Sequence, residues 1–162
     1  MSAAINLGHI DDAALRFLLG NRCFTKAICA IGTTASTVKT TTNTVQYSID
    51  GQIYEKAAAN DLFVFTDTTV QPVATTAFYA LCLDSAGTAT VVNGTPVLTS
   101  KITAGTEKAY FPEVPGNVCI IGGVKVVTDA THTFTPGTTL LSAAGITDEY
   151  FNFSCIPING YA

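Results

Sequence analysis

The stretch Val45-Gln-Tyr-Ser-Ile-Asp-Gly-Gln-Ile-Tyr54 alternates apolar and polar side chains on both sides of an Asp-Gly pair. Strict alternation is typical of a β-strand that buries one face. Asp-Gly between two such runs is a strong hairpin signal, because both turn positions of a tight hairpin need positive φ. The sequence therefore predicts a β-hairpin that turns at Asp50-Gly51.

The rest of the chain repeats this pattern of short strands separated by turn residues. Expected strands are Leu62–Phe65, Ala77–Leu83, Thr88–Val92, Val118–Ile121, Val124–Val127 and Thr131–Thr135, with Gly122-Gly123 at a hairpin or bulge. Segments 55–60 and 140–145 could each form one helical turn. Such spacing predicts an all-β fold, an antiparallel β-sandwich or a jelly-roll-like barrel.

Threonine is unusually frequent, with 26 of 162 residues, and it is concentrated in the tract between Thr33 and Thr44. As a β-branched residue it suits a pleated, half-exposed surface. We expect the tract to be an exposed run that leads into the hairpin. A disordered threonine linker is the alternative.

The first 30 residues follow a different pattern. Asp11 and Asp12 could cap a short helix in which Leu15, Leu18 and Leu19 recur at helical spacing, and Gly20 could end it. A single helical turn or an extended arm is equally compatible with so short a segment. The expected organisation is an N-terminal arm over residues 1–30 and a β-sandwich domain over residues 31–162.

Composition restricts the possible partners. Charged residues make up 12% and hydrophobic residues 48% of the chain, and so few charges leave a surface poorly protected against association. A very stable monomer or burial in an assembly would each account for this. A net charge of −4 without a basic cluster predicts no nucleic-acid binding. No apolar run reaches the roughly 18 residues of a membrane span, and no signal peptide is recognisable, so we expect synthesis in a cytoplasm.

Residues that could carry chemistry are sparse and scattered. His9 and His132 lack carboxylates at ligand spacing and are expected to be solvated surface residues. The acidic pairs Asp11-Asp12 and Asp148-Glu149 would not converge on one site, because neighbours along a strand point to opposite faces. Ser142 and Ser154 lie outside any nucleophile motif.

Three further groups were considered as sites. The run from Asp61 to Asp67 lacks the alternating acids of a calcium loop. The aromatic residues could form a sugar-stacking face, but cross-strand core pairs are favoured; they are Tyr47, Tyr54, Phe78, Tyr79, Tyr110 and Phe111. Five cysteines without a Cys-x-x-Cys pair are expected to be free, mostly buried thiols; they are Cys23, Cys29, Cys82, Cys119 and Cys155. The sequence thus predicts no enzyme, and no catalytic, cofactor-binding or metal-binding residue.

Four stretches carry a resemblance to a known class of protein. They are Thr44-Val-Gln-Tyr-Ser-Ile-Asp-Gly-Gln-Ile-Tyr-Glu-Lys56, Tyr79-Ala-Leu-Cys-Leu-Asp-Ser-Ala-Gly-Thr-Ala-Thr-Val-Val92, Phe134-Thr-Pro-Gly-Thr-Thr139 and Leu141-Ser-Ala-Ala-Gly-Ile-Thr-Asp148. Together they resemble small virion proteins of tailed bacteriophages, of the type that decorates or cements the capsid. The shared features are strands and turns and include no catalytic signature.

The resemblance implies a β-rich core on the capsid exterior, in a virion assembled after synthesis in the host cytoplasm. It also implies a homo-oligomer, with a trimer favoured over a dimer, whose arms clamp the major capsid protein. Residues 1–30 are where we would expect that arm. A trimeric head or tail fibre, or a receptor-binding β module, is the alternative function. A carbohydrate or peptide hydrolase acting through Asp148 or Glu149 is the least favoured.

Overall fold

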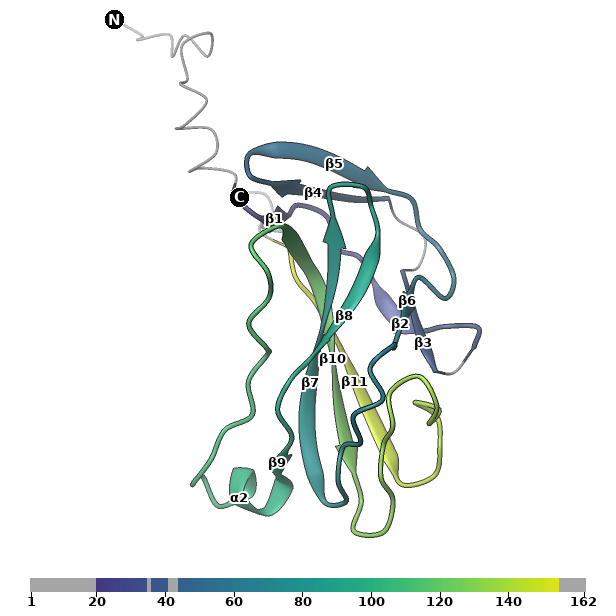
Figure 1. Cartoon of the computed structure of the whole chain (residues 1–162), viewed down its shortest axis with the longest axis vertical. Helices are drawn as coiled ribbons and strands as arrows, with labels where there is room; N and C mark the ends of the chain where they lie inside the picture. Colours follow the sequence, from purple (N-terminus) through teal and green to yellow (C-terminus); the bar gives the residue numbers. More distant parts are fainter. Residues whose placement is uncertain (1–19, 35, 41–43, 155–162) are drawn as a thin grey trace, which may run out of the picture.

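The computed structural model describes residues 20–34, 36–40 and 44–154 of the chain (Figure 1). Its elements are β1 (Arg22–Cys23), β2 (Cys29–Ile31), β3 (Thr37–Thr40), β4 (Val45–Ile49), β5 (Gln52–Lys56), β6 (Phe63–Val64), β7 (Thr75–Asp84), β8 (Ala89–Asn93), β9 (Val97–Leu98), α2 (Thr99–Thr103), β10 (Val118–Thr128) and β11 (Ile146–Asn152). All strand pairings are antiparallel. The predicted all-β antiparallel class is therefore confirmed.

The hairpin predicted from the opening stretch is present as β4 and β5. Asp50 and Gly51 form its turn with φ of 49° and 82°, so both positions have the positive φ that this turn requires. Tyr47 pairs directly with Tyr54 across the two strands, and their rings stack with centroids 5.7 Å apart. Local sequence thus determines both the turn and the register of this hairpin.

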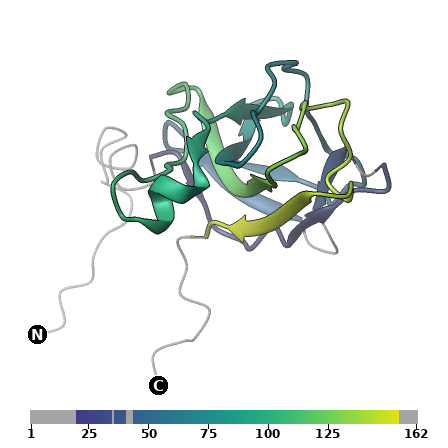
Figure 2. The ribbon, with the colours of Figure 1, turned by 90° about the horizontal axis from the view of Figure 1, so that it is seen from below.

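The largest sheet is built around two long strands, β7 and β10. Its order is β11-β10-β7-β8, and β9 also pairs with β7. Two smaller sheets, β1-β4-β5 and β2-β3-β6, complete the fold. Strands β1 and β4 contact β10, β6 contacts β8, and β2 contacts β11. Seen from below, the purple and blue strands of the small sheets and the green and yellow strands of the large sheet surround one interior (Figure 2).

The interior is one apolar cluster shared by all three sheets, as expected for a sandwich-like arrangement. Its fully buried members come from facing strands, for example Val38, Tyr47, Phe63, Leu81 and Val124, each 0% exposed. All three sheets contribute to this cluster, and the large sheet carries a second, smaller one, in which Phe111 and Val114 pack against Ala80, Cys82 and Val118.

Gly122 and Gly123 do not separate two strands. They lie inside the continuous β10, where the register with β7 shifts between Ile120 and Gly122. The predicted bulge is confirmed, whereas the prediction of two separate strands is wrong. The reason is close packing on both sides of the sheet: a Cβ at Gly122 would lie 2.8 Å from Cys29 Sγ, and one at Gly123 would overlap the Phe111 ring.

The threonine tract is not wholly the exposed run that we expected. Its residues 37–40 form β3, the central strand of its sheet, and Thr37 and Thr40 are buried. Burial is possible because each hydroxyl is bonded: Thr37 Oγ1 donates to Asp61, and Thr40 Oγ1 accepts the N–H of Ala59. Residues 41–43 of the tract lie outside the described residues.

Three local expectations are also wrong: one stretch joins a strand, and two form turns or a loop. Residues 55–56 continue the ladder of β5 instead of starting a helical turn. Residues 140–145 form consecutive turns that end at Gly145, whose φ is +77°. Residues 131–135 form a loop with a single bridge, Gln71 to Phe134. Strand β11 and helix α2 were not predicted.

Strands begin before the expected boundary at residue 30. Strand β1 pairs with β4, and β2 pairs with β3, so residues 22–31 belong to the folded body and not to an arm. The start of the body is held by Asn21, whose Nδ2 donates to the carbonyls of Gly116 (2.6 Å) and Val118 (2.9 Å). The rest of the expected arm, residues 1–19 with Asp11, Asp12 and His9, lies outside the described residues. Within the described part of the chain, no helix is long and apolar enough to cross a membrane.

Candidate functional site

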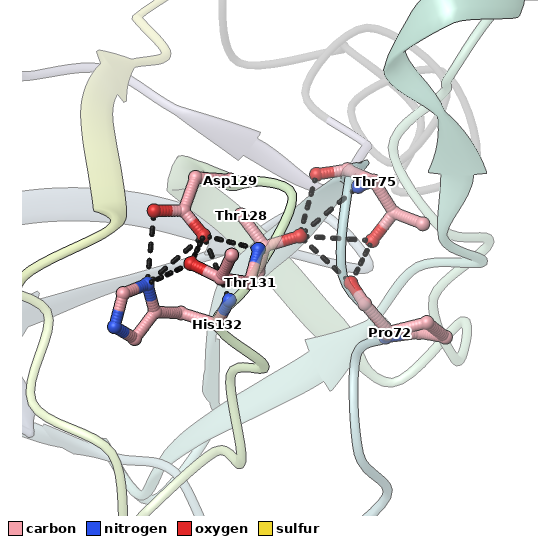
Figure 3. Close-up of polar contacts among 6 residues, drawn as sticks. All are labelled: Pro72, Thr75, Thr128, Asp129, Thr131 and His132. Atoms are coloured by element: carbon pink, nitrogen blue, oxygen red, sulfur yellow. Dashed lines mark hydrogen bonds and ion pairs between the residues drawn. The ribbon is translucent and has the colours of Figure 1, made fainter.

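The most polar cluster lies in the loop that follows β10, around Asp129 (Figure 3). Asp129 Oδ1 accepts the backbone N–H groups of Thr131 (2.8 Å) and His132 (2.7 Å). His132 Nδ1 lies 2.9 Å from each carboxylate oxygen. These hydrogen bonds hold the pKa of Asp129 well below its usual range, the bond from the Thr131 N–H contributing most. The loop therefore contains a stable carboxylate that orients the imidazole.

This cluster contains an acid and a histidine, as a catalytic dyad does, but they are not arranged for catalysis. A hydrolytic triad places the acid on one ring nitrogen of the histidine and the nucleophile on the other. Here the Thr131 hydroxyl lies 3.0 Å from Nδ1, the nitrogen that already faces Asp129. His132 is about half exposed, as the sequence predicted, although the carboxylate three residues earlier was missed. These contacts indicate that the Asp129 carboxylate stabilises the conformation of the loop.

A second group of hydroxyls lies on the other side of the same strand end (Figure 3). Thr128 Oγ1 donates to the carbonyl of Pro72 (2.7 Å) and accepts the N–H of Thr75 (3.0 Å). Next to it, the fully buried Gln71 donates through Nε2 to the carbonyls of Thr75 (3.2 Å) and Val126 (3.0 Å). Its Oε1 accepts the hydroxyl of Tyr79 (2.8 Å). The side chains of Thr128 and Gln71 make their hydrogen bonds within the protein, which is typical of a structural role and not of a reactive site.

The cysteines described by the structure are buried thiols, as predicted: Cys23, Cys29, Cys82 and Cys119. Burial raises the pKa of Cys29 and of Cys82 to about 12 each. These two thiols are therefore protonated at neutral pH, whereas the thiolate is the form that acts as nucleophile and metal ligand. Cys155 lies outside the described residues.

The acidic candidates do not converge. Asp148 and Glu149 are successive residues of β11 and so point to opposite faces, and Glu149 Oε2 accepts from Lys125 Nζ at 3.0 Å. Asp61 accepts the Thr37 hydroxyl and the N–H of Thr34 (2.8 Å), and these bonds lower its pKa, the one from Thr37 contributing most. Asp67 accepts the N–H of Thr69 (2.8 Å). Across the described residues, no three side chains of the metal-binding types form a group.

The prediction of cross-strand core pairs is confirmed for Tyr47, which pairs with Tyr54, whereas Phe78 and Phe111 pack together but are only partly buried. Tyr47 and Tyr79 are buried, and the Tyr47–Tyr54 and Phe78–Phe111 pairs have centroids 5.7 Å and 4.7 Å apart. Tyr110 belongs to neither pair, and 69% of its surface is exposed. Single exposed apolar residues are normal, so the surroundings of Tyr110 determine whether it forms a site.

Tyr110 lies on the long segment 104–117, which follows α2 and runs along the outer face of the large sheet (Figure 1). Two cavities open beside it. One, of about 320 Å³, is lined by Asn93, Thr95, Lys108, Tyr110 and Glu113, among others. The second, of about 390 Å³, is lined mainly by apolar surface, and it shares Lys108 and Tyr110 with the first. Cavities of this size fall in the range of small-molecule sites, about 300–1,000 Å³. This is the candidate binding site.

The second cavity is built from both sheet and helix. Its lining includes Phe78 and Val127 of the large sheet and Ile102 of α2. A further cavity of about 440 Å³ lies at the other end of the molecule, beside Asn21, Asp50 and Asn117. It adjoins the place where residues 1–19 join the body.

Comparison of the chain with protein-family models, with curated proteins and with solved structures found no match. The function must therefore be inferred from the residues themselves.

Proposed function

We propose that this chain is a structural virion protein that binds the outer surface of a bacteriophage head and decorates or cements it. Its partners would be the major capsid protein and further copies of itself, as a trimer in preference to a dimer. The proposal starts from the resemblance carried by the hairpin and turn stretches. It is supported by a surface built from few charges, because permanent interfaces are depleted of charge and resemble a core cut in half.

One structural observation carries the proposal: both ends of the described body lie beside the first half of β10. Ser48 Oγ donates to the carbonyl of Gly20 (2.8 Å), and Asn21 is bonded to Val118. At the other end of the chain, the N–H of Phe153 donates to the carbonyl of Ile121 (3.1 Å). Residues 1–19 and 155–162 therefore join the body at the same end of the sandwich.

A body with both terminal segments at one end suits a clamp. The segments can contact neighbouring capsid subunits while the opposite end, with α2 and the loops around residues 129–145, faces away. Many copies arranged by capsid symmetry would give avidity even if each contact is weak. In this arrangement residues 1–19 form the arm, and the arm is shorter than the segment expected from sequence.

The test is immunogold electron microscopy of purified particles with antibody raised against the isolated protein. Label spread over the head supports decoration, and label confined to the tail supports the fibre or receptor-binding alternative. Particles without any label would refute both.

Deletion of residues 1–19 is the next step, because it keeps Asn21 and β1 and so leaves the body folded. We expect loss of particle binding with an unchanged circular dichroism spectrum. If the deletion variant still binds particles at full occupancy, residues 1–19 are not the arm that contacts the capsid.

A further inference from the structure

Tyr110 is held in its exposed position by its neighbour Phe111. In an extended segment successive side chains point in opposite directions, and Phe111 enters an aromatic cluster on the outer face of the large sheet. Its ring centroid lies 4.7 Å from that of Phe78, 5.8 Å from Phe151 and 5.2 Å from Phe153. Gly123 leaves room for this ring, since a Cβ there would overlap it. Phe111 points toward the sheet, and Tyr110 therefore points toward solvent.

The segment also packs closely against the large sheet beside Tyr110. Gly94 donates its N–H to the carbonyl of Phe78 (2.8 Å), and a Cβ at Gly94 would lie 3.2 Å from the carbonyl oxygen of Tyr110. The absence of a side chain at Gly94 thus allows the segment to pack closely on the end of β8. A side chain on a closely packed segment loses little entropy when it binds a ligand.

The surroundings of Tyr110 combine an apolar ring with several polar groups of both charges. The first cavity is lined by Asn93, Lys108 and Glu113 together with Tyr110. In the second, Lys125 is already paired with Glu149 at 3.0 Å. The positive charges are therefore matched by negative ones, and the site has no net charge to favour an ionic ligand.

We propose that Tyr110 and the two cavities that it lines bind a neutral oligosaccharide. A pyranose ring offers an apolar C–H face that stacks on an aromatic ring, and its hydroxyls both donate and accept hydrogen bonds. Asn93, Lys108 and Glu113 supply both donors and acceptors in the first cavity. Because Tyr110 and Lys108 line both cavities, a chain of more than one sugar unit would occupy them together. This activity goes beyond the proposed capsid attachment and does not depend on it.

The test is binding of the full-length protein to immobilised neutral hexaoses of glucose, galactose and N-acetylglucosamine. We expect binding to at least one of them, and a loss of about tenfold or more in affinity for Tyr110→Ala, the equivalent of roughly 1.4 kcal/mol for one stacking contact. Tyr110→Phe keeps the ring and should keep the affinity within about threefold of wild type. Ile53→Ala, which removes a side chain 63% exposed on β5, is the matched control and should change nothing.

Two results would overturn the proposal: no binding to any sugar of the panel by the folded protein, or binding that Tyr110→Ala leaves unchanged. A third measurement separates the sugar site from a protein interface. If Tyr110→Ala abolishes occupancy of particles and the wild type binds no sugar, the tyrosine contacts the capsid and the sugar site is refuted. Failure of the 1–19 deletion to affect particle binding would count against the capsid arm alone.

Discussion

Replacing Gln71 with leucine is expected to be among the most damaging single changes in the interior. Gln71 is 1% exposed and makes three side-chain hydrogen bonds, to Tyr79, Thr75 and Val126. Gln71→Leu keeps the volume but leaves the Tyr79 hydroxyl buried without its acceptor, which costs about 1–3 kcal/mol, and it removes two further bonds of about 1 kcal/mol each. We expect a loss of roughly 3 kcal/mol in the free energy of unfolding. For a chain of this size that lowers Tm by roughly 10 °C.

The assay is urea unfolding followed by circular dichroism, with Tyr79→Phe as the second arm of a double-mutant cycle. Tyr79→Phe removes the orphaned hydroxyl, so the double variant should be more stable than Gln71→Leu by about 1–2 kcal/mol. A loss below about 1 kcal/mol for Gln71→Leu, or strictly additive effects in the cycle, would refute the reasoning that the buried hydroxyl depends on Gln71.

Three further predictions concern other parts of the fold. Gly123→Ala should lower the free energy of unfolding by about 1–3 kcal/mol in urea, because the new methyl group overlaps the ring of Phe111. The control Gly116→Ala, where a Cβ would meet nothing within 4 Å, should be nearly neutral. Equal effects of the two variants would contradict this. The pKa of Asp129 is lowered on folding, so its stabilising effect is full at neutral pH and declines as the pH falls below about 4 towards the folded-state pKa. The stability difference between wild type and Asp129→Asn should therefore shrink in acid, and a difference independent of pH between 7 and 2 would count against a stabilising role of the carboxylate. In a Cys155→Ser background the buried thiols should resist a thiol reagent at pH 8 and react on unfolding; rapid labelling of the native protein, at Cys82 for example, would show that burial does not protect them.

Sequence reasoning succeeded where the determinants are local. The hairpin follows from alternation and from two adjacent residues that tolerate positive φ, Asp50 and Gly51. The strand over residues 77–83 was also found, because a continuous apolar run bounded by turn residues identifies a central strand. Neither inference needs knowledge of distant parts of the chain.

The errors arise where the partner is remote. Gly122 and Gly123 were read as a break, yet they are required by Cys29 and Phe111, residues 93 and 12 positions away. Thr37 was expected on the surface, because nothing near it shows that Asp61 will bond its hydroxyl. Strand β11 is only half-buried and contains Asp148 and Glu149, so its apolar pattern is weak.

The candidate site was only partly accessible to sequence analysis. Tyr110 was among the aromatic residues considered, but its neighbours do not distinguish it from Tyr79, which is buried. The distinction comes from the aromatic cluster that takes Phe111, and that cluster forms only when β7, β10 and β11 are in place. Asp129 was missed although a local signal existed, since Asp-x-Thr-His suits a turn in which the carboxylate bonds the following N–H groups.

Strand β10 pairs with β7 and β11 and contacts β1 and β4. The first and last strands that the structure describes, β1 and β11, therefore both pack on a strand that begins at residue 118. During synthesis the first 117 residues can form the β4–β5 hairpin, but they cannot complete the large sheet or close the shared core. Closure waits until β11, which ends at residue 152, has left the ribosome, and the pairing of residue 76 with residue 127 joins segments about 50 positions apart. Folding is therefore expected to be late, slow and all-or-none, on the millisecond-to-second scale of β proteins with distant contacts.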